Sequence, residues 1–562
     1  MKKIFNLIYT VSLSFNNFQH PILFLMVFFL LQHPKMSSQQ IPAPAVSDTI
    51  LRTDIVDVVK TFEARLEEAR MITVIPPAPV ITPLERTYRY DVTIVPLELN
   101  FPDPVIRPIS MKSDDPKQYL NHYLKAGYGN LKNAYVDLSI REVFDDINDW
   151  YINAYVRTGD DSENIAFQKY HDLRVKGGAG LSVFETSRLE IKAGLQQNQR
   201  HFFYNRDDRS QEFEMEDVRR NISVFNNGIS FYNSFHQDAG VDYRIDLDNR
   251  FTRVSDLNEN EINSRLYAVF TRKSTKNTGF TLAGGFDFNR SFGSTDVIGL
   301  FDPRLVVTGK KVLLEGGINY AYANSGHYLF PSVMIKWSID DKAMQIIAGA
   351  QQTYHRNNLI NTIEFNPFAK GMDTLNTRIG QEIFGGIQGK LADFTYQGKA
   401  GWRKVNHQVV FNVDFDDDLR RLDAITADLN VIFIQGNIEY DLNKRFTVGG
   451  ILTRNFFSNV STERMWHIFP TELNAYFRGG IMNDKLVLRA DLFVRDRARV
   501  LDMGESVFLP GLFDLNAEIE VNPSKNFGIW AKALNLFNVN YSPWLGYPIF
   551  GIHFQGGILV RF

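Results

Sequence analysis

The stretch that decides the fold class is the last one, FGIHFQGGILVRF, at positions 550–562. Apolar residues and glycine occupy every second position, and the positions between them include polar ones. The first set comprises Phe550, Ile552, Phe554, Gly556, Ile558, Val560 and Phe562, and the second includes His553, Gln555 and Arg561. Because successive side chains of a strand point to opposite faces, this period of two predicts a β-strand with one apolar and one polar face.

The same alternation recurs upstream. Four further segments place apolar residues at every second position and charged or polar residues between them: 173–183, 189–195, 486–494 and 513–521. Within the third segment, Leu488 belongs to the apolar face and Arg489 to the polar face. Short turn signals such as Asn443-Lys444, Asn483-Asp484 and Ser524-Lys525 separate segments of this kind.

A soluble β-sandwich shows similar alternation, because one face of each strand packs on a core and the other meets water. Two features favour a membrane barrel instead. The repeat runs almost unbroken from Tyr119 to Phe562, and the chain ends inside a strand on an aromatic residue. A closed barrel also removes the exposed edge of that strand. We therefore predict an all-β fold, a transmembrane antiparallel barrel over residues 119–562, with about 22 strands of roughly 9–15 residues.

Composition agrees with this class. Aromatic residues make up 13% of the 562 positions, including 45 Phe and 23 Tyr, and membrane barrels carry aromatic girdles at both interfaces. The mean hydropathy of -0.21 fits alternating lumen-facing and lipid-facing residues. A formal net charge of -3 gives no argument for a nucleic-acid partner. The absence of cysteine, with a count of 0, excludes disulfides, thiolate metal sites and a cysteine nucleophile.

The beginning of the chain reads as a targeting segment. Lys2 and Lys3 precede a long apolar stretch, densest from Ile22 to Leu31, and a polar run follows it. This order predicts a secretory signal peptide over residues 1–39. The alternative is a single membrane anchor, but the strictly apolar core falls short of the roughly 20 residues that a spanning helix needs.

Residues 40–118 differ from everything after them. One short helix is possible between Ile50 and Arg70, and a proline-rich stretch follows. Because proline lacks an N–H and fixes φ, this stretch should be extended and difficult to pack as a core. We expect a periplasmic segment, either a linker or a tether that docks against the barrel.

Two motifs carry a family resemblance. The segment Leu534-Asn535-Leu536-Phe537-Asn538, followed by Tyr541, looks like the C-terminal end of TonB-dependent receptors, and Trp544, Tyr547, Pro548 and Gly556-Gly557 fit the same ending. The segment Glu364-Phe365-Asn366-Pro367-Phe368 is another pattern associated with such barrels. The resemblance implies a barrel of the plugged-transporter type. The usual N-terminal plug and TonB box have no convincing counterpart here, which puts TonB-driven import in doubt.

The same resemblance suggests where the chain resides and what it meets. Together with the signal peptide, it implies the outer membrane of a Gram-negative bacterium, with lipid around the barrel. The aromatic Phe562 resembles the C-terminal signal read by the barrel-assembly machinery. A surface lipoprotein or an envelope complex is a further possible partner.

No catalytic, cofactor-binding or metal site is predicted. The sequence contains no H-E-x-x-H, no G-x-S-x-G and no glycine-rich phosphate loop. His201, His236 and His553 are isolated and are interpreted as lumen or interface residues. We therefore expect a protein that is not an enzyme.

Two groups of charged residues can each be interpreted in two ways, as a functional site or as ordinary structural charges. The acidic runs Asp414, Asp416, Asp417, Asp418 and Asp160, Asp161, Glu163 could offer oxygen ligands to calcium, but they lack the pattern of a calcium loop and fit solvated turns better. Arg188, Lys192, Arg489 and Arg495 could set ion preference in a channel, or could neutralise Glu190 and Asp491 inside the barrel.

Two functions follow from these observations. The first is a TonB-dependent receptor-like barrel that mediates the binding or passage of a solute at the outer membrane. The alternative is a non-transporting accessory or scaffold subunit of an outer-membrane protein-insertion or secretion complex.

Overall fold

A computed structural model describes residues 122–562, except positions 145–147, 185–186, 204–213, 215, 217, 234–239, 275–276, 292, 324–325, 341–342, 373–375, 414–420, 444, 459–465 and 503. The predicted signal peptide at 1–39 and the segment at 40–118, with its helix, therefore lie outside the described residues. So do His236 and the acidic run that begins at Asp414.

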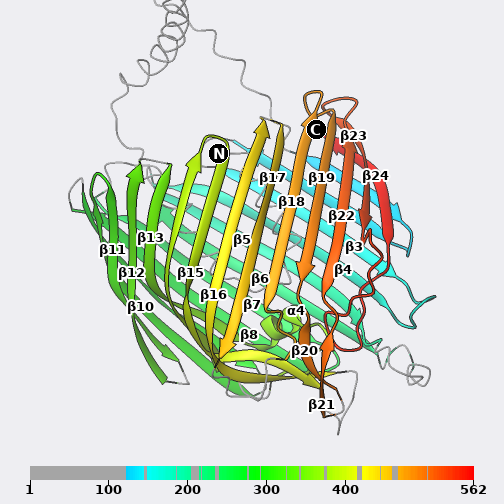
Figure 1. The fold of residues 1–562 in the computed structure, drawn as a ribbon, viewed down its shortest axis with the longest axis horizontal. Helices are drawn as coiled ribbons and strands as arrows, with labels where there is room; N and C mark the ends of the chain where they lie inside the picture. Colours follow the sequence, from blue (N-terminus) through cyan, green and yellow to red (C-terminus); the bar gives the residue numbers. More distant parts are fainter. Residues whose placement is uncertain are drawn as a thin grey trace, which may run out of the picture. The chain divides into compact units, whose positions relative to one another are not determined.

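The described chain forms 22 strands of one antiparallel sheet, as the alternation predicted (Figure 1). In chain order the strands of this sheet are β1 (Tyr123–Gly129), β2 (Ala134–Val143), β3 (Asp149–Asp160), β4 (Lys169–Val183), β5 (Ser187–His201), β6 (Arg219–Asn233), β7 (Asp242–Val254), β8 (Glu259–Lys273), β9 (Thr278–Ser291), β10 (Ser294–Thr308), β11 (Val312–Ala323), β12 (Gly326–Asp340), β13 (Met344–Asn357), β14 (Asn376–Leu391), β15 (Phe394–Val413), β16 (Leu422–Asn443), β17 (Phe446–Ser458), β18 (Thr471–Ile481), β19 (Leu486–Arg495), β22 (Leu512–Val521), β23 (Phe527–Leu534) and β24 (His553–Arg561).

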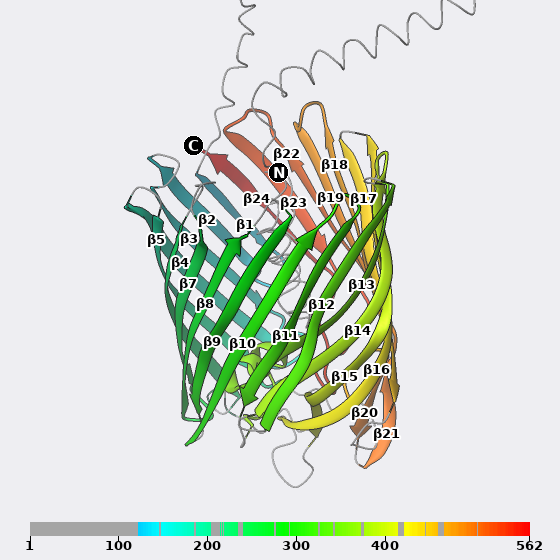
Figure 2. The same ribbon diagram turned by 90° about the vertical axis from the view of Figure 1, so that its left-hand side faces the viewer.

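The sheet closes on itself through its first and last strands. Tyr123 of β1 lies opposite Arg561 of β24, and the pairing continues to Gly129 and Gln555. The backbone of His122 also exchanges two hydrogen bonds with that of Phe562, at 3.2 and 3.0 Å. The fold is therefore a closed barrel, which Figure 2 shows from the side of β8–β12.

Alternate residues of each strand face outward, and these are mostly apolar. Along β5 the outward series includes Ile191, which is 46% exposed, and Leu195, and it turns polar at Gln197. Leu488 lies opposite Ile519, which belongs to the outward apolar set, while Arg489 lies opposite Glu518 and contacts it inside the barrel. The predicted assignment of Leu488 to lipid and Arg489 to the lumen agrees with this geometry.

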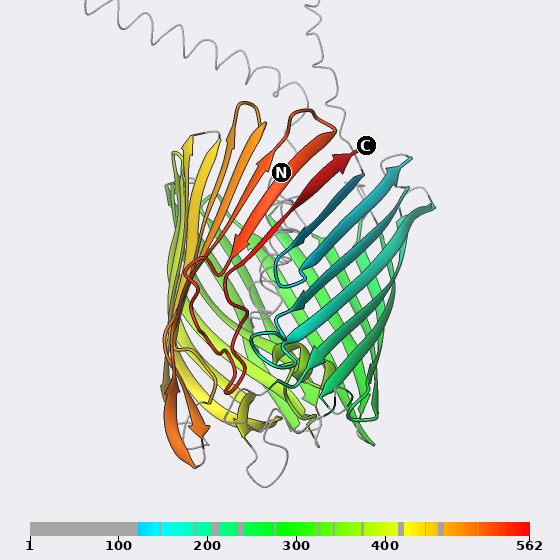
Figure 3. The same ribbon diagram turned by 90° about the vertical axis from the view of Figure 1, so that its right-hand side faces the viewer.

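The two ends of the barrel differ in their connections. The end where β1 begins and β24 ends, called the terminal end below, carries short turns such as 392–393 and 522–526. The opposite end, called the loop end, carries the longest connections, 358–375 and 535–552 among them (Figure 3). It also carries the one α-helix of the described residues, α4 (Leu359–Phe365), and a separate hairpin of β20 (Ala498–Asp502) and β21 (Glu505–Leu509). No helix within the described residues has the length and hydropathy needed to cross a membrane.

Strand lengths depart from the expected range at both extremes. β15 and β16 have 20 and 22 residues, because their ends continue past the barrel wall. β1 and β23 have 7 and 8 residues. The final strand begins at His553, so the prediction that it includes Phe550 and Ile552 is wrong. Both residues belong to the 535–552 connection, which replaces regular strand on the loop side of β23 and β24.

A bulge turns the end of β15 inward. The pairing of β15 with β16 shifts register between Val405 and Gln408, and His407 has a φ of 57°. Beyond this point Val409, Val410 and Phe411 are buried in succession, so both faces of the strand are covered. The yellow ends of this hairpin run across the loop end in Figure 1.

Candidate functional site: a lid at the loop end

Segments from distant strands meet at the loop end. We call this assembly the lid, and it consists of 358–372, the hairpin ends 408–413 and 421–427, and segments 466–470 and 535–552. These segments connect β13 to β14, β15 to β16, β17 to β18 and β23 to β24. Three of these strand pairs are consecutive in the sheet and the fourth is further along it, but the buried residues of the lid also include Phe202, Phe203 and Val218 beside β5 and β6, so the lid joins separate parts of the barrel rim.

The lid has an aromatic core of its own. Phe368 stacks on Tyr547 with ring centroids 3.5 Å apart and planes at 7°, and Phe365 meets the edge of Trp544 at 5.3 Å. The buried members of the core are Phe202, Phe203, Val218, Phe368, Ala369, Met372, Val409, Phe411, Leu422, Trp544 and Tyr547. The two motifs that carry the family resemblance, which are far apart in the sequence, therefore meet here.

Helix α4 anchors the lid to the inner wall. Its buried residues Leu359, Ile360 and Ile363 pack on Ile222, Val224 and Val254 of β6 and β7. At its start, the Asn358 side chain accepts a hydrogen bond from the backbone of Asn361 at 3.1 Å, an ordinary N-cap. Glu261 of β8 then accepts hydrogen bonds from the Asn358 amide at 3.0 Å and the Leu359 N–H at 2.7 Å. A buried carboxylate of the wall thus fixes the first turn of the helix.

Arg220 ties the next part of the same segment to β6. Its side chain is 0% exposed and forms an ion pair with Asp256 at 2.7 Å. It also donates to the carbonyl oxygens of Pro367 and Ala369 at 2.9 and 2.7 Å. Ala369 in turn forms a parallel bridge with Leu422 of β16. One guanidinium therefore joins the wall to the centre of the lid.

The N-L-F-N motif organises segment 535–552. Asn535 and Asn538 both adopt positive φ, 48° and 49°, a conformation that Asn tolerates better than most residues. The Asn535 amide donates to the carbonyls of Val539 and Phe550 at 3.1 and 2.9 Å and accepts from the Val539 N–H at 2.8 Å. Asn538 accepts from the Ile552 N–H at 3.0 Å. The motif therefore satisfies backbone groups where regular strand is missing.

His467 lies where three parts of the lid meet. Its ring contacts the carbonyl oxygen of Phe411 through Nδ1 at 3.0 Å, and its Nε2 accepts the N–H of Leu545 at 3.2 Å. Its own N–H donates to the carbonyl of Arg499 on β20 at 2.9 Å. Burial lowers the pKa of His467 to about 4, because an imidazolium loses its hydration there.

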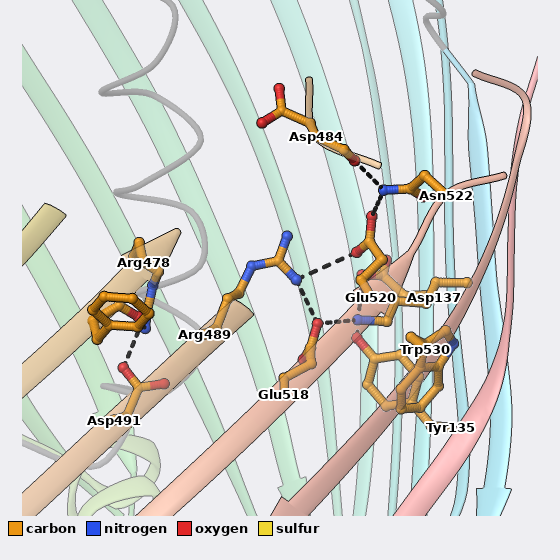
Figure 4. Close-up of polar contacts among 12 residues, drawn as sticks. Tyr135, Asp137, Arg478, Asp484, Arg489, Asp491, Glu518, Glu520, Asn522 and Trp530 are labelled. Atoms are coloured by element: carbon orange, nitrogen blue, oxygen red, sulfur yellow. Dashed lines mark hydrogen bonds and ion pairs between the residues drawn. The ribbon is translucent and has the colours of Figure 1, made fainter. Parts of the chain in front are cut away.

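A ladder of ion pairs lines the inner wall near the closing seam (Figure 4). Glu518 of β22 meets Lys125 of β1 at 2.8 Å and also contacts Arg489. Glu520 accepts from Arg561 of β24 at 2.6 Å, and Arg489 lies 3.3 Å from it. The carboxylates of this wall are thus matched by cations on adjacent or nearby strands.

The predicted lumen charges have partners other than those expected. Arg188 pairs with Asp149, Lys192 with Asp248 at 2.9 Å, and Arg495 with Glu472 at 3.7 Å. Asp491 pairs with Arg478 at 2.5 Å. These groups therefore form ion pairs inside the barrel, and the pairs described here join them to carboxylates on other strands, because strand register decides the pairing.

The remaining candidates do not assemble into a reactive site. Asp160 accepts hydrogen bonds from Ser162 and Asp161 from Asn164, so both serve their own turn, and Glu163 lies 3.9 Å from Lys132. The rings of His201 and His553 contact the backbone carbonyls of Lys169 and Gly551. Within the described residues, no three His, Cys, Asp or Glu side chains group as metal ligands.

Sequence reasoning missed Arg220, Glu261 and His467. Each is a single polar residue in a strand or connection, without spacing that sets it apart. Their roles arise only when connections from different strands meet. The two motifs were the available signal, since both of them belong to the lid.

Comparisons with known proteins give the fold but no sequence relative. No family model and no curated protein sequence matches the chain. Among solved structures, the FrpB iron transporter of Neisseria meningitidis is similar at a TM-score of 0.62 and 11% identity, covering 78% of this chain and 81% of that one. The siderophore receptor PirA of Acinetobacter baumannii gives 0.60 and 8%, covering 78% and 80%. The ferric enterobactin receptor PfeA of Pseudomonas aeruginosa gives 0.59 and 11%, covering 79% and 80%.

These likenesses confirm the resemblance at the level of the fold. The chain has a 22-stranded closed barrel like that of these solved TonB-dependent receptors, the class of barrel found in the outer membrane of Gram-negative bacteria. In such barrels the short turns face the periplasm and the longer loops face outward. This rule predicts that the loop end, and with it the lid, faces the cell surface.

Proposed function

We propose that this chain is a receptor-like barrel that binds or admits a solute at the cell surface, with the lid as its gate. The observation that carries the proposal is the shared core of the lid, in which Phe368 from one side of the mouth stacks on Tyr547 from the other. A solute that enters through the mouth must displace this contact. The function is one of transport or binding, not of catalysis, as in the receptors whose fold it shares.

The energetics suit a gate. An aromatic pair contributes about 0.5–1.5 kcal/mol beyond its buried area, so the few pairs that hold the lid stabilise it less than the long strand ladders stabilise the wall. Local opening free energies in proteins range from near zero up to the global value. The lid should therefore open while the barrel remains intact.

Below the lid, the wall presents matched charges. The ladder around Glu518, Glu520 and Arg489 carries both signs in close contact. A wall of this kind offers hydrogen-bonding groups to a polar solute and gives little preference for ions of one sign. We therefore expect weak ion selectivity once the lid is displaced.

Conductance in a planar bilayer tests the gate. The intact chain should show rare, small openings, and the double variant Phe368→Ala with Tyr547→Ala should show frequent, larger ones because the central stack is lost. The matched control is Phe446→Ala with Phe477→Ala, an aromatic pair 5.9 Å apart near the terminal end. Both proteins are also measured after deletion of residues 40–118, so that this segment cannot account for the result. Equal conductance in the lid variant and the intact chain would rule out the lid as the gate.

The same packed lid also fits the second function, a scaffold in an insertion or secretion complex, because a closed mouth is no obstacle to that role. A pull-down from native outer membranes in gentle detergent separates the two. Stoichiometric envelope-complex subunits would favour the scaffold. Recovery alone, or with a surface lipoprotein, would favour the receptor-like gate. The barrel-assembly machinery is proposed as the partner that inserts the chain.

For the N-terminal part we propose a cleaved signal peptide over residues 1–39 and a periplasmic linker or tether over residues 40–118. N-terminal sequencing of the mature protein tests the first. Solute uptake measured with and without TonB tests energy coupling. Unchanged uptake would support a barrel that works without TonB.

Deletion of residues 40–118 tests the tether. If conductance and partner binding stay unchanged, the segment is only a linker.

A further inference from the structure

His467 makes backbone contacts with three separate parts of the lid. The contacts reach Phe411 at the bent end of β15, Leu545 in segment 535–552 and Arg499 on β20. The residue is 2% exposed, and its ring lies 5.5 Å from that of Trp544. One residue thus connects the elements that must separate when the lid opens, with its ring joining two of them.

The hydrogen bonds of the ring specify its protonation state. Phe411 contributes a carbonyl oxygen, which only accepts, so Nδ1 must carry a proton. Leu545 contributes an N–H, which only donates, so Nε2 must offer its lone pair. The ring is therefore neutral, and a second proton on Nε2 would face the Leu545 N–H and break that contact.

Among the residues that the structure describes, no carboxylate acts on the His467 ring. Burial and the Phe411 carbonyl are the influences that act on His467 among the described residues. On the elements around it, Arg499 of β20 places its guanidinium over Phe508 at 4.6 Å, and Arg421 before β16 lies over Phe202 at 5.3 Å. Tyr547 of segment 535–552 stacks on Phe368. Two of these groups are cations and the third is a neutral phenol at ordinary pH.

We propose that His467 is a proton-sensitive latch: its neutral ring holds the bent end of β15 to segment 535–552, and protonation releases the lid. The inference rests on the proposed gate, because it names a signal that opens the same lid. An acidic surface environment would then favour the open state.

The sign of the effect follows from linkage. The pKa of His467 is lowered to about 4 in the closed lid, against about 6.5 for an exposed histidine. The released lid therefore binds more protons than the closed lid between these values. The contribution of His467 to closure is fully present above about pH 6.5 and is lost as the pH falls toward 4.

Hydrogen exchange of the full-length protein in lipid, read on lid peptides from 358–372 and 535–552, tests the latch. The intact protein and the variant His467→Asn are compared at the same pH, so that the chemical exchange rate cancels. From pH 7.5 to 4.5, the intact lid should lose at least about tenfold more protection than the variant lid. His171→Asn, at an exposed position of β4, is the matched control and should behave like the intact protein.

Each outcome decides a separate question. Equal pH dependence in the intact protein and in His467→Asn would overturn the latch, provided both migrate as folded, heat-modifiable barrels. His467→Gln supplies a second non-titrating variant if the first does not fold. Acid release of the lid that depends on His467 without any change in conductance would support the latch and reject the gate.

Discussion

At the scale of the residue, position relative to lipid decides what a substitution costs. Ile191 points outward from the middle of the apolar band on β5, while Gln196 on the same strand points into the lumen. An arginine at the lipid face costs about 2–4 kcal/mol near the midplane, and lumen positions tolerate charge. Ile191→Arg should therefore lower the free energy of unfolding in lipid by that amount, and Gln196→Arg by much less. Equal losses in a urea titration would mean that the two faces are assigned wrongly.

Arg220, in contrast to a charge placed in lipid, is a buried charge whose guanidinium is paired. Its removal leaves the Asp256 carboxylate and the carbonyls of Pro367 and Ala369 without their donor. Loss of one partner of a buried pair costs about 3–5 kcal/mol. Arg220→Ala should therefore reduce exchange protection in 358–372, while the exposed Arg253→Ala should change it little. Unchanged protection in Arg220→Ala would show that this residue does not hold the lid.

Alternation alone predicted the facing of individual strand residues. Leu488 and Arg489 were separable in the sequence because a strand has only two faces. Arg220 and Glu261 were not, because they lie on the lumen face like many other polar residues, and only the arrival of segment 358–372 gives them partners. His467 was missed for the same reason, since both of its ring contacts come from other elements.

At the scale of the element, segment 535–552 shows how irregular backbone is stabilised beside a membrane barrel. Asn535 is 4% exposed and satisfies three backbone groups through its amide. Leaving buried polar groups without partners costs about 1–3 kcal/mol. Asn535→Ala should therefore weaken the segment by that order and raise exchange of the Val539 N–H, which loses its acceptor. The control is Phe537→Ala, at an exposed position of the same motif.

If Asn535→Ala and Phe537→Ala have equal effects on exchange in 539–552, the amide is not the stabilising group. The motif itself was visible in the sequence, but its role was not. Strands could be predicted because their pattern is local, with a period of two. The inward turn of β15 depends on a bulge near His407, and the lid depends on which connections meet, and neither leaves a local pattern.

At the scale of the whole molecule, the closed barrel depends on the pairing of β1 with β24. This seam is short, with pairing from Tyr123 to Gly129, and it is rich in glycine, since Gly127 lies opposite Gly557 and Tyr128 opposite Gly556. Trp530 of β23, which is 2% exposed, fills the space beside Gly127. The number of strands was predictable from length and repeat. The tightness of the seam was not, because it depends on the contact between the two ends of the sheet.

Gly557 is a position where closure is sensitive to added volume. A Cβ at this residue would lie 1.9 Å from the Ala126 carbonyl oxygen and 2.5 Å from the Gly127 Cα. Both are backbone atoms of the partner strand, so the two strands must move apart to accommodate it. Gly557→Ala should therefore yield a smaller fraction of heat-modifiable, closed barrel on a gel. Gly436→Ala, where a Cβ meets nothing within 4 Å, should fold like the unaltered chain. A normal closed fraction for Gly557→Ala would mean that the seam is looser than the register of β1 and β24 implies.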